Sequence, residues 1–159
     1  MDQNQLLRES LRKLLDWEDA HISFDHAIEG IDPRKQGELP QGFAHTLWQL
    51  LEHLRRCQFD ILDFCINPNY EERSMSDYWP PSGAPPSSKA WRESVDLFRG
   101  DREKLKKLAM DPRVDLFARI PHGSGQTYLR ELILVADHNA YHVGQIVAAR
   151  RALGDWKDS

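Results

Sequence analysis

The chain of 159 residues has few cysteines, no long apolar run and no excess of basic residues, and each shortage excludes a class of protein. Two cysteines, Cys57 and Cys65, are too few for a disulfide framework. The longest apolar run, residues 132–136, is far shorter than the ~20 residues that span a bilayer. With 21 Lys and Arg against 25 Asp and Glu, the net charge of −4 argues against nucleic-acid binding, because neutralising phosphates requires basic residues. The N-terminus lacks a basic region followed by an apolar stretch, so we expect a cytoplasmic protein without a signal peptide.

The length fits one domain that folds without disulfides or a bound metal, so we expect residues 1–159 to form a single domain. Apolar residues recur at helical spacing in four segments, which predicts helices over 5–28, 43–66, 88–110 and 126–153. Four such helices indicate an all-α four-helix bundle. The last is apolar around most of its circumference, which predicts the most buried helix, with a wet edge at Arg130, Asp137 and Arg151.

A long loop separates the second and third predicted helices. Residues 67–88 contain five of the nine prolines, which excludes a helix of any length. The loop also carries Tyr70, Tyr78 and Trp79, and long loops in compact domains are often lids or binding loops. Two interpretations stay open: the aromatic side chains cover the mouth of a site, or they only pin the loop to the bundle.

Seven histidines are the most unusual feature of the composition. His138 and His142 are four residues apart, which on a helix places both imidazoles on one face and within reach of one metal ion. His45 and His53 are ~12 Å apart along the second helix, too far to share an ion. His53 flanks the apolar stripe and is the better third ligand, whereas we expect His45 at the helix start as a capping or pocket-rim residue. The alternative is that these histidines are exposed or hydrogen-bonded and bind no metal.

Other polar residues were weighed as parts of the same site. The interval between His138 and His142 contains no glutamate, so the zinc-protease signature and its general base are absent. A base would come from elsewhere, and the rim candidates are His21, Asp25, His122 and Glu131. His26 needs no special role.

Two further side chains have an open assignment. Cys57 follows His53 by one turn and could be a ligand or nucleophile, but a buried structural thiol is the favoured interpretation. Tyr141 points away from both neighbouring histidines on the helical projection, which favours a core or interface residue over a catalytic one.

Several segments together resemble the DinB/YfiT-like family over nearly the whole chain. They are LLEHL at 50–54, HNAYHVGQ at 138–145, HTLWQ at 45–49, the Tyr-Trp-Pro loop and the Ala-Asp-His at 136–138. The resemblance implies a bundle with up-down-down-up topology and a divalent ion held by three histidines, here His53, His138 and His142. Zinc and nickel are the favoured ions, and iron and manganese also accept imidazole ligands.

The resemblance also implies a chemistry. Three imidazoles leave a coordination position open, as in catalytic sites. Some relatives are metal-dependent transferases or isomerases that use low-molecular-weight thiols such as bacillithiol or mycothiol. We therefore expect a metal-dependent enzyme acting on small molecules, a transferase or hydrolase with the thiol-dependent transferase favoured, and a homodimer, as relatives often are. The alternatives are a non-catalytic metal-binding or stress-response bundle and a structural domain without a metal.

Overall fold

The computed structural model describes residues 2–16 and 18–156, and within them the chain is all-α, as predicted. An isolated bridge between Arg119 and Thr127 is the only β-type pairing of this described part. None of its helices combines the length and apolar character needed to cross a membrane. The helices are α1 (Gln3–Leu14), α2 (Phe24–Ile28), α3 (Leu47–Ile66), the 3-10 helix η1 (Met75–Tyr78), α4 (Ser88–Met110) and α5 (Tyr128–Ala152).

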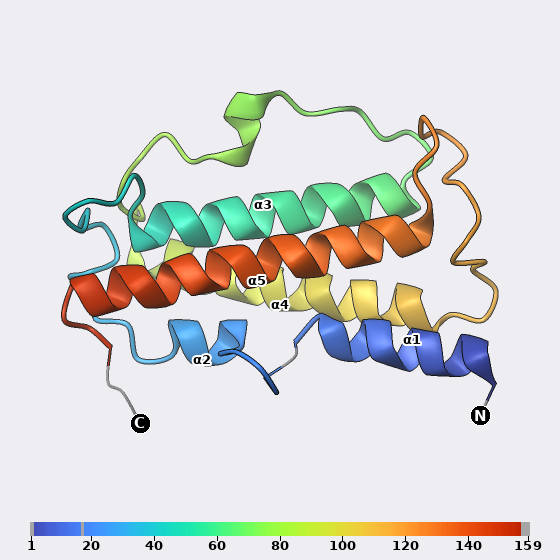
Figure 1. Cartoon of the computed structure of the whole chain (residues 1–159). Coiled ribbons are helices and arrows are strands. Elements are labelled where there is room, and N and C mark those ends of the chain that lie inside the picture. Colours follow the sequence, from blue (N-terminus) through green and yellow to red (C-terminus); the bar gives the residue numbers. More distant parts are fainter. Residues whose placement is uncertain (1, 17, 157–159) are drawn as a thin grey trace.

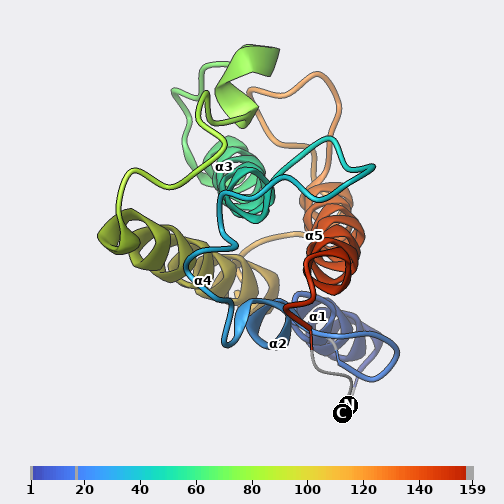
Figure 2. The same cartoon turned by 90° about the vertical axis from the view of Figure 1, so that its left-hand side faces the viewer.

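The long helices lie side by side, and α3 contacts both α4 and α5 (Figures 1 and 2). The colour sequence in Figure 1 shows α3 and α4 running in one direction and α1 and α5 in the other. Residues 67–87 return along the outside of α3 and carry η1 (Figure 1). α1 and α2 lie end to end along one side of the bundle, where α1 contacts α4 and α5 and α2 contacts α5.

The prediction of one continuous helix over 5–28 is wrong, because the chain leaves the helix after Leu14 and starts again at Phe24. Basic residues in the last turn of α1 favour its C-terminal end. The Ser23 side chain then accepts a hydrogen bond from the His26 backbone N–H and caps the new helix α2. Trp17, which was one of the apolar positions behind the prediction, lies outside the described residues.

Side-chain caps also decide where the other helices begin. α3 starts four residues later than predicted because Thr46 and Gln49 form a capping box, each side chain bonding the other's backbone N–H. α4 has the predicted bounds and α5 lies within two residues of them, with Ser87 and Thr127 as N-caps. Gly154, with a φ of +67°, follows the end of α5 as predicted.

The core forms two apolar clusters along the bundle. One contains Phe24, Leu47, Leu51, Trp91, Phe98, Val143 and Ile146 among others. The second contains Leu11, Leu62, Leu105, Leu132 and Val135 among others. Both clusters include side chains from α3 and α5, so these two helices form the shared frame on which the histidines stand.

α5 is less enclosed than predicted. Arg130, Asp137 and Arg151 are exposed, as expected for its wet edge. Apolar side chains share that edge, however, and Tyr141 is 64% exposed, so of its two expected placements, core or interface, the core is excluded. α5 therefore buries one broad face and leaves a partly apolar stripe uncovered.

Candidate metal centre

The structure brings together the three histidines that the sequence singled out. His53 stands on α3, and His138 and His142 stand one turn apart on α5. The ring centroid of His53 lies 5.1 Å from that of His138 and 4.5 Å from that of His142, and the two α5 rings are 4.5 Å apart. Three imidazoles from two helices thus form one compact cluster.

Hydrogen bonds set which ring nitrogen of His53 and of His142 has a free lone pair. His53 Nδ1 lies 3.0 Å from the Tyr78 carbonyl oxygen, and because a carbonyl only accepts, Nδ1 is the donor. His142 Nδ1 lies 2.7 Å from Gln145 Oε1 and donates in the same way. Each ring therefore keeps a lone pair on Nε2. Donation of the other ring N–H to an oxygen is the usual arrangement of metal-binding histidines.

The spacing of two ring nitrogens fits a shared ion. His53 Nε2 and His138 Nε2 are 3.2 Å apart. Two nitrogens at zinc-ligand distances of about 2.0–2.1 Å and a tetrahedral angle would be roughly 3.4 Å apart. The spacing of the His53 and His138 nitrogens therefore fits a divalent cation such as zinc, whereas His142 joins them at the level of its ring, 4.5 Å from each of the other two ring centroids.

Cys57 is the other group near these nitrogens. Ligand atoms of His53, Cys57 and His138 all lie within 4.8 Å of one another. The Cys57 sulfur is 3.6 Å from Nδ1 and 3.7 Å from Nε2 of His53, and this near-equal separation puts it beside the ring rather than in line with the Nε2 lone pair. Burial, aided by the Asp60 carboxylate, raises the pKa of the thiol to about 12. In this arrangement Cys57 is a protonated neighbour of the His53 ring.

The environment keeps the imidazoles neutral. Burial, together with the neighbouring histidines, lowers the pKa of His53 and of His138 to about 4. Burial also lowers the pKa of His142. Neutral rings are the form in which histidine binds a metal, so the cluster is ready for a cation at neutral pH.

A buried amide pair, which the sequence analysis missed, holds α5 against α3 beside the cluster. Asn139, next to His138, donates from Nδ2 to Gln58 Oε1 at 3.0 Å. Gln58 is fully buried and donates from Nε2 to the Phe98 carbonyl of α4 at 2.7 Å. The signal in the sequence is a polar residue at an inward position on each helix, Gln58 and Asn139.

The aromatic loop lies over the cluster. The Trp79 ring stacks on His53 with centroids 3.9 Å apart and planes 8° apart, and its other neighbour is His45 at 3.8 Å. His45 is therefore a rim residue, since Thr46 takes the N-cap of α3. The loop shows features of both interpretations, because Trp79 covers the ring of His53 whereas the Tyr70 and Tyr78 hydroxyls tie the loop to Asp60 of α3.

Two of the rim candidates, His122 and Glu131, line one cleft next to the cluster. The cleft has a volume of about 530 Å³ and includes Tyr78, whose carbonyl accepts from His53. His122 Nε2 lies 2.8 Å from the Phe64 carbonyl oxygen. Glu131 is buried and forms an ion pair with Arg130. The cleft adjoins the cluster through Tyr78, and its lining includes none of the three clustered histidines.

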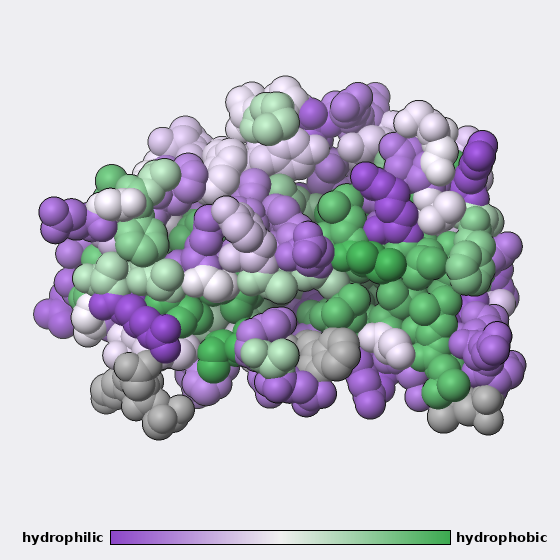
Figure 3. Space-filling model, viewed as in Figure 1, coloured by the Kyte–Doolittle hydropathy of each residue, from purple (hydrophilic) through white to green (hydrophobic). Residues whose placement is uncertain are grey.

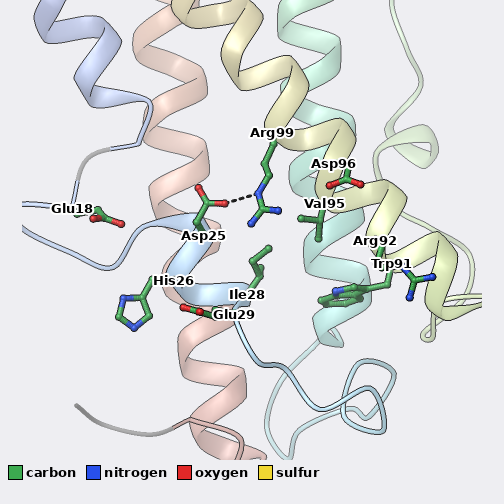
Figure 4. Close-up of a pocket in the computed structure, with 10 residues that line it drawn as sticks. All are labelled: Glu18, Asp25, His26, Ile28, Glu29, Trp91, Arg92, Val95, Asp96 and Arg99. Atoms are coloured by element: carbon green, nitrogen blue, oxygen red, sulfur yellow. Dashed lines mark hydrogen bonds and ion pairs between the residues drawn. The ribbon is translucent and has the colours of Figure 1, made fainter.

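The other two rim candidates, His21 and Asp25, lie elsewhere. His21 is exposed and stands between α1 and α2 rather than on a helix. Asp25 stands on α2 and accepts hydrogen bonds from Arg99 and Arg102 of α4. Burial acts to raise the pKa of Asp25, but these two guanidinium groups outweigh it and lower the pKa. Asp25 lines a separate cleft of about 620 Å³ between α2 and α4 (Figure 4).

Comparison with known proteins gives one finding. The model of a family described as the DinB superfamily matches residues 16–146, a span that includes the three clustered histidines. The comparisons with curated proteins and with solved structures gave no match.

Proposed function

Because the chain belongs to the DinB superfamily, we propose that it is a metal-dependent enzyme whose divalent ion is held by His53, His138 and His142. The observation that carries the proposal is the convergence of these three neutral rings from α3 and α5. Zinc or nickel is the ion we favour, because imidazole nitrogen suits both. We also assign the long helices to an up-down-down-up bundle, which their directions in Figure 1 support.

His142 is a better third ligand than Cys57. Its Nδ1 donates to Gln145, which leaves Nε2 free, and its ring faces that of His53 edge to face at 4.5 Å between centroids. The Cys57 sulfur would have to turn away from the ring of His53 and lose its proton before it could bind the same ion. Three neutral ligands leave an open position for a further, anionic one.

An open position of this kind suits a thiol substrate. A divalent ion held there would lower the pKa of a coordinated thiol, so that the thiol would lose its proton to solvent and be available as a thiolate nucleophile at neutral pH. We propose a low-molecular-weight thiol, such as bacillithiol or mycothiol, whose sulfur bonds to an electrophilic carbon while a leaving group departs with its electron pair. Trp79 shields the His53 side of the site from water, and the cleft lined by His122 and Glu131 receives the body of the small molecule.

Metal content tests the ligands. Untagged wild type should hold about one ion per chain after growth with zinc or nickel, whereas His53→Ala and His142→Ala should hold little. His26→Ala is the matched control, because that exposed imidazole stacks on Trp156 away from the cluster. Equally low content in wild type and ligand variants, also after iron or manganese supplementation, would rule out the metal site.

Thiol turnover tests the reaction. The metal-loaded protein is mixed with a low-molecular-weight thiol and a panel of electrophiles, and thiol consumption is followed for wild type and His142→Ala. Turnover that disappears in the variant supports the enzyme. A loaded protein that consumes no thiol would favour the non-catalytic metal-binding bundle.

We further propose a homodimer that forms through α1 and α5. Exposed apolar side chains gather over these helices (Figure 3), among them Leu6, Ile133 and Leu134, which are 49%, 48% and 37% exposed. Sedimentation should show a dimer that Ile133→Glu converts to a monomer. Leu97→Glu, at an equally exposed leucine of α4, should leave the dimer intact, and a wild-type monomer would contradict the proposal.

A further inference from the structure

Residues 75–79, here named the strap, lie along the outside of α3 (Figure 1), where the Tyr78 carbonyl meets the His53 ring. Arg56 of α3 donates from Nη1 to the carbonyl oxygens of Asp77 and Trp79 at 3.0 and 3.4 Å. The Tyr78 hydroxyl donates to Asp60 Oδ2 at 2.8 Å. The strap is thus tied to α3 by its backbone and by a side chain.

Tyr78 contacts two residues of α3 with its opposite ends. Its carbonyl accepts from His53 Nδ1 at 3.0 Å, and its hydroxyl reaches Asp60. His53 and Asp60 are seven residues apart, which puts them on one face of α3 about 10.5 Å apart along its axis. A single residue therefore bridges two turns of the helix and joins a carboxylate to a ligand histidine.

The Asp60 end of this bridge is itself held firmly. Asp60 is only 9% exposed, and its Oδ1 accepts from the Tyr70 hydroxyl at 3.0 Å and from Arg73. Burial, together with the Asp60 carboxylate, raises the pKa of Tyr70 to about 12 and also raises that of Tyr78, so both hydroxyls keep their protons and donate. The carboxylate is a fixed anchor because several donors hold it at once.

We propose that Asp60 and Tyr78 are positioning residues for His53: the anchored strap presents the Tyr78 carbonyl to Nδ1 and so holds the ring in the tautomer and orientation that turn Nε2 toward His138. The Trp79 ring, stacked on His53, restricts the same ring from its face. The consequence for metal affinity rests on the proposed function, whereas the consequence for the His53 tautomer does not.

The competing explanation is that the loop is merely pinned to the bundle, and the chain offers a matched pair of variants to separate the two. Tyr70→Phe and Tyr78→Phe each remove one hydroxyl that donates to Asp60 and keep the ring. Only Tyr78 also carries the carbonyl that accepts from His53. Positioning predicts a difference between the two variants, whereas general pinning predicts equal effects.

The first readout needs no metal. Nitrogen NMR of the imidazoles in the metal-free protein should show His53 protonated on Nδ1 in wild type and in Tyr70→Phe. Tyr78→Phe should show a mixture of the Nδ1 and Nε2 tautomers, because the strap keeps its Arg56 bonds but loses the anchor that fixes Tyr78 itself on Asp60. An unchanged Nδ1 tautomer in Tyr78→Phe would overturn the proposal.

The second readout is zinc affinity, measured by competition with a chromophoric chelator. Loss of a direct hydrogen-bond partner of a ligand histidine typically lowers metal affinity by about 10–100-fold. Tyr78→Phe removes a hydroxyl that does not itself contact His53, so it should weaken zinc binding by less, roughly 3–10-fold. Tyr70→Phe should stay within about twofold of wild type. Equal losses in the two variants would overturn the positioning role.

Failure of the proposed function gives a different pattern from failure of the strap. A wild type that binds no zinc, nickel, iron or manganese contradicts the metal site. The positioning role of the strap is then tested by the His53 tautomer alone, which is measured in the metal-free protein. If Tyr78→Phe folds poorly, Arg56→Met removes the donor to the Asp77 and Trp79 carbonyls, together with the ion pair to Glu52, and should shift the same tautomer balance. An unchanged His53 tautomer in a folded Arg56→Met variant would count against the strap.

Discussion

Gln58 joins α3 to both of its large neighbours in the interior, and its replacement tests how the frame of the histidine cluster is held. The side chain is fully buried, donates to the Phe98 carbonyl at 2.7 Å and accepts from Asn139 at 3.0 Å. Gln58→Met keeps the length of the side chain but removes both hydrogen bonds. The variant tests whether these bonds stabilise the fold or only accompany apolar packing.

The expected loss follows from these two bonds. Each contributes about 1 kcal/mol net, and the Asn139 amide left without an acceptor in the interior adds about 1 kcal/mol or more. The Asn139 Oδ1 atom already lacks a partner within the described residues, so the whole amide would then be unpaired. We expect Gln58→Met to lower the free energy of unfolding by about 3 kcal/mol, which corresponds to a fall in Tm of about 6–12 °C for a chain of this size.

A second substitution separates hydrogen bonding from packing. Gln58→Met with Asn139→Leu replaces both partners by apolar groups and should return to within about 1 kcal/mol of wild type. Urea unfolding followed by circular dichroism gives the free energy of unfolding of the four proteins of this double-mutant cycle: wild type, Gln58→Met, Asn139→Leu and the double variant. Gln3→Met, at an exposed position, is the control. A single variant within about 0.5 kcal/mol of wild type, or a double variant as unstable as the sum of the singles, would refute the reasoning.

Three further predictions concern stability. Arg8 is buried and donates to the carbonyls of Ala109, Asp111 and Val114. Arg8→Met should therefore lower the free energy of unfolding, measured in urea, by about 2–4 kcal/mol. A loss below about 1 kcal/mol would contradict this. Removing zinc with a chelator should lower the Tm of zinc-loaded wild type by about 5–10 °C, because an ion at 100 times its Kd adds about 2.7 kcal/mol to the free energy of unfolding. The Tm of His142→Ala should not change on chelation. Burial alone would raise the pKa of Asp25, but Arg102 and Arg99 lower it below its usual value of 3.8. The ion pairs of Asp25 therefore stabilise the fold at pH values above 3.8, and this stabilisation is lost as the pH falls through the lowered pKa. The Tm advantage of wild type over Asp25→Asn should therefore shrink from about pH 6 to about pH 3, and a constant gap would exclude this linkage.

The parts of the site that could be predicted from the sequence are those set by the geometry of one helix. The spacing of His138 and His142 places both rings on one face of α5 wherever that helix packs. The inward position of His53 on α3 was also readable, because it flanks an apolar stripe. The meeting of the two helices depends on packing between distant segments, which needed the structure.

Backbone groups and local caps explain what could not be predicted. The partner of His53 Nδ1 is the carbonyl of Tyr78, and any residue at that position offers the same atom, so no residue type signals it. The start of α2 at Phe24 depends on the Ser23 cap, a single hydrogen bond that competes with an apolar period spanning the whole segment. Helical periodicity therefore predicted a longer first helix than the chain forms.

The position of the cluster explains why polar residues are tolerated in the interior of α3 and α5. Gln58 and Asn139 bond each other there, and His53 and His138 stand beside them on the same two helices. Amides and neutral imidazoles can be buried at this level because each side chain has at least one donor, acceptor or, as we propose, ion as a partner, although His138 Nδ1 and Asn139 Oδ1 have none within the described residues. The amide pair ties α5 to α3 one residue from His138, while the strap bonds the ring of His53 from outside the bundle. The distance between His53 Nε2 and His138 Nε2 is therefore controlled by the amide pair on one side and by the strap on the other. A substitution that loosens either the amide pair or the strap should weaken metal binding before it unfolds the chain.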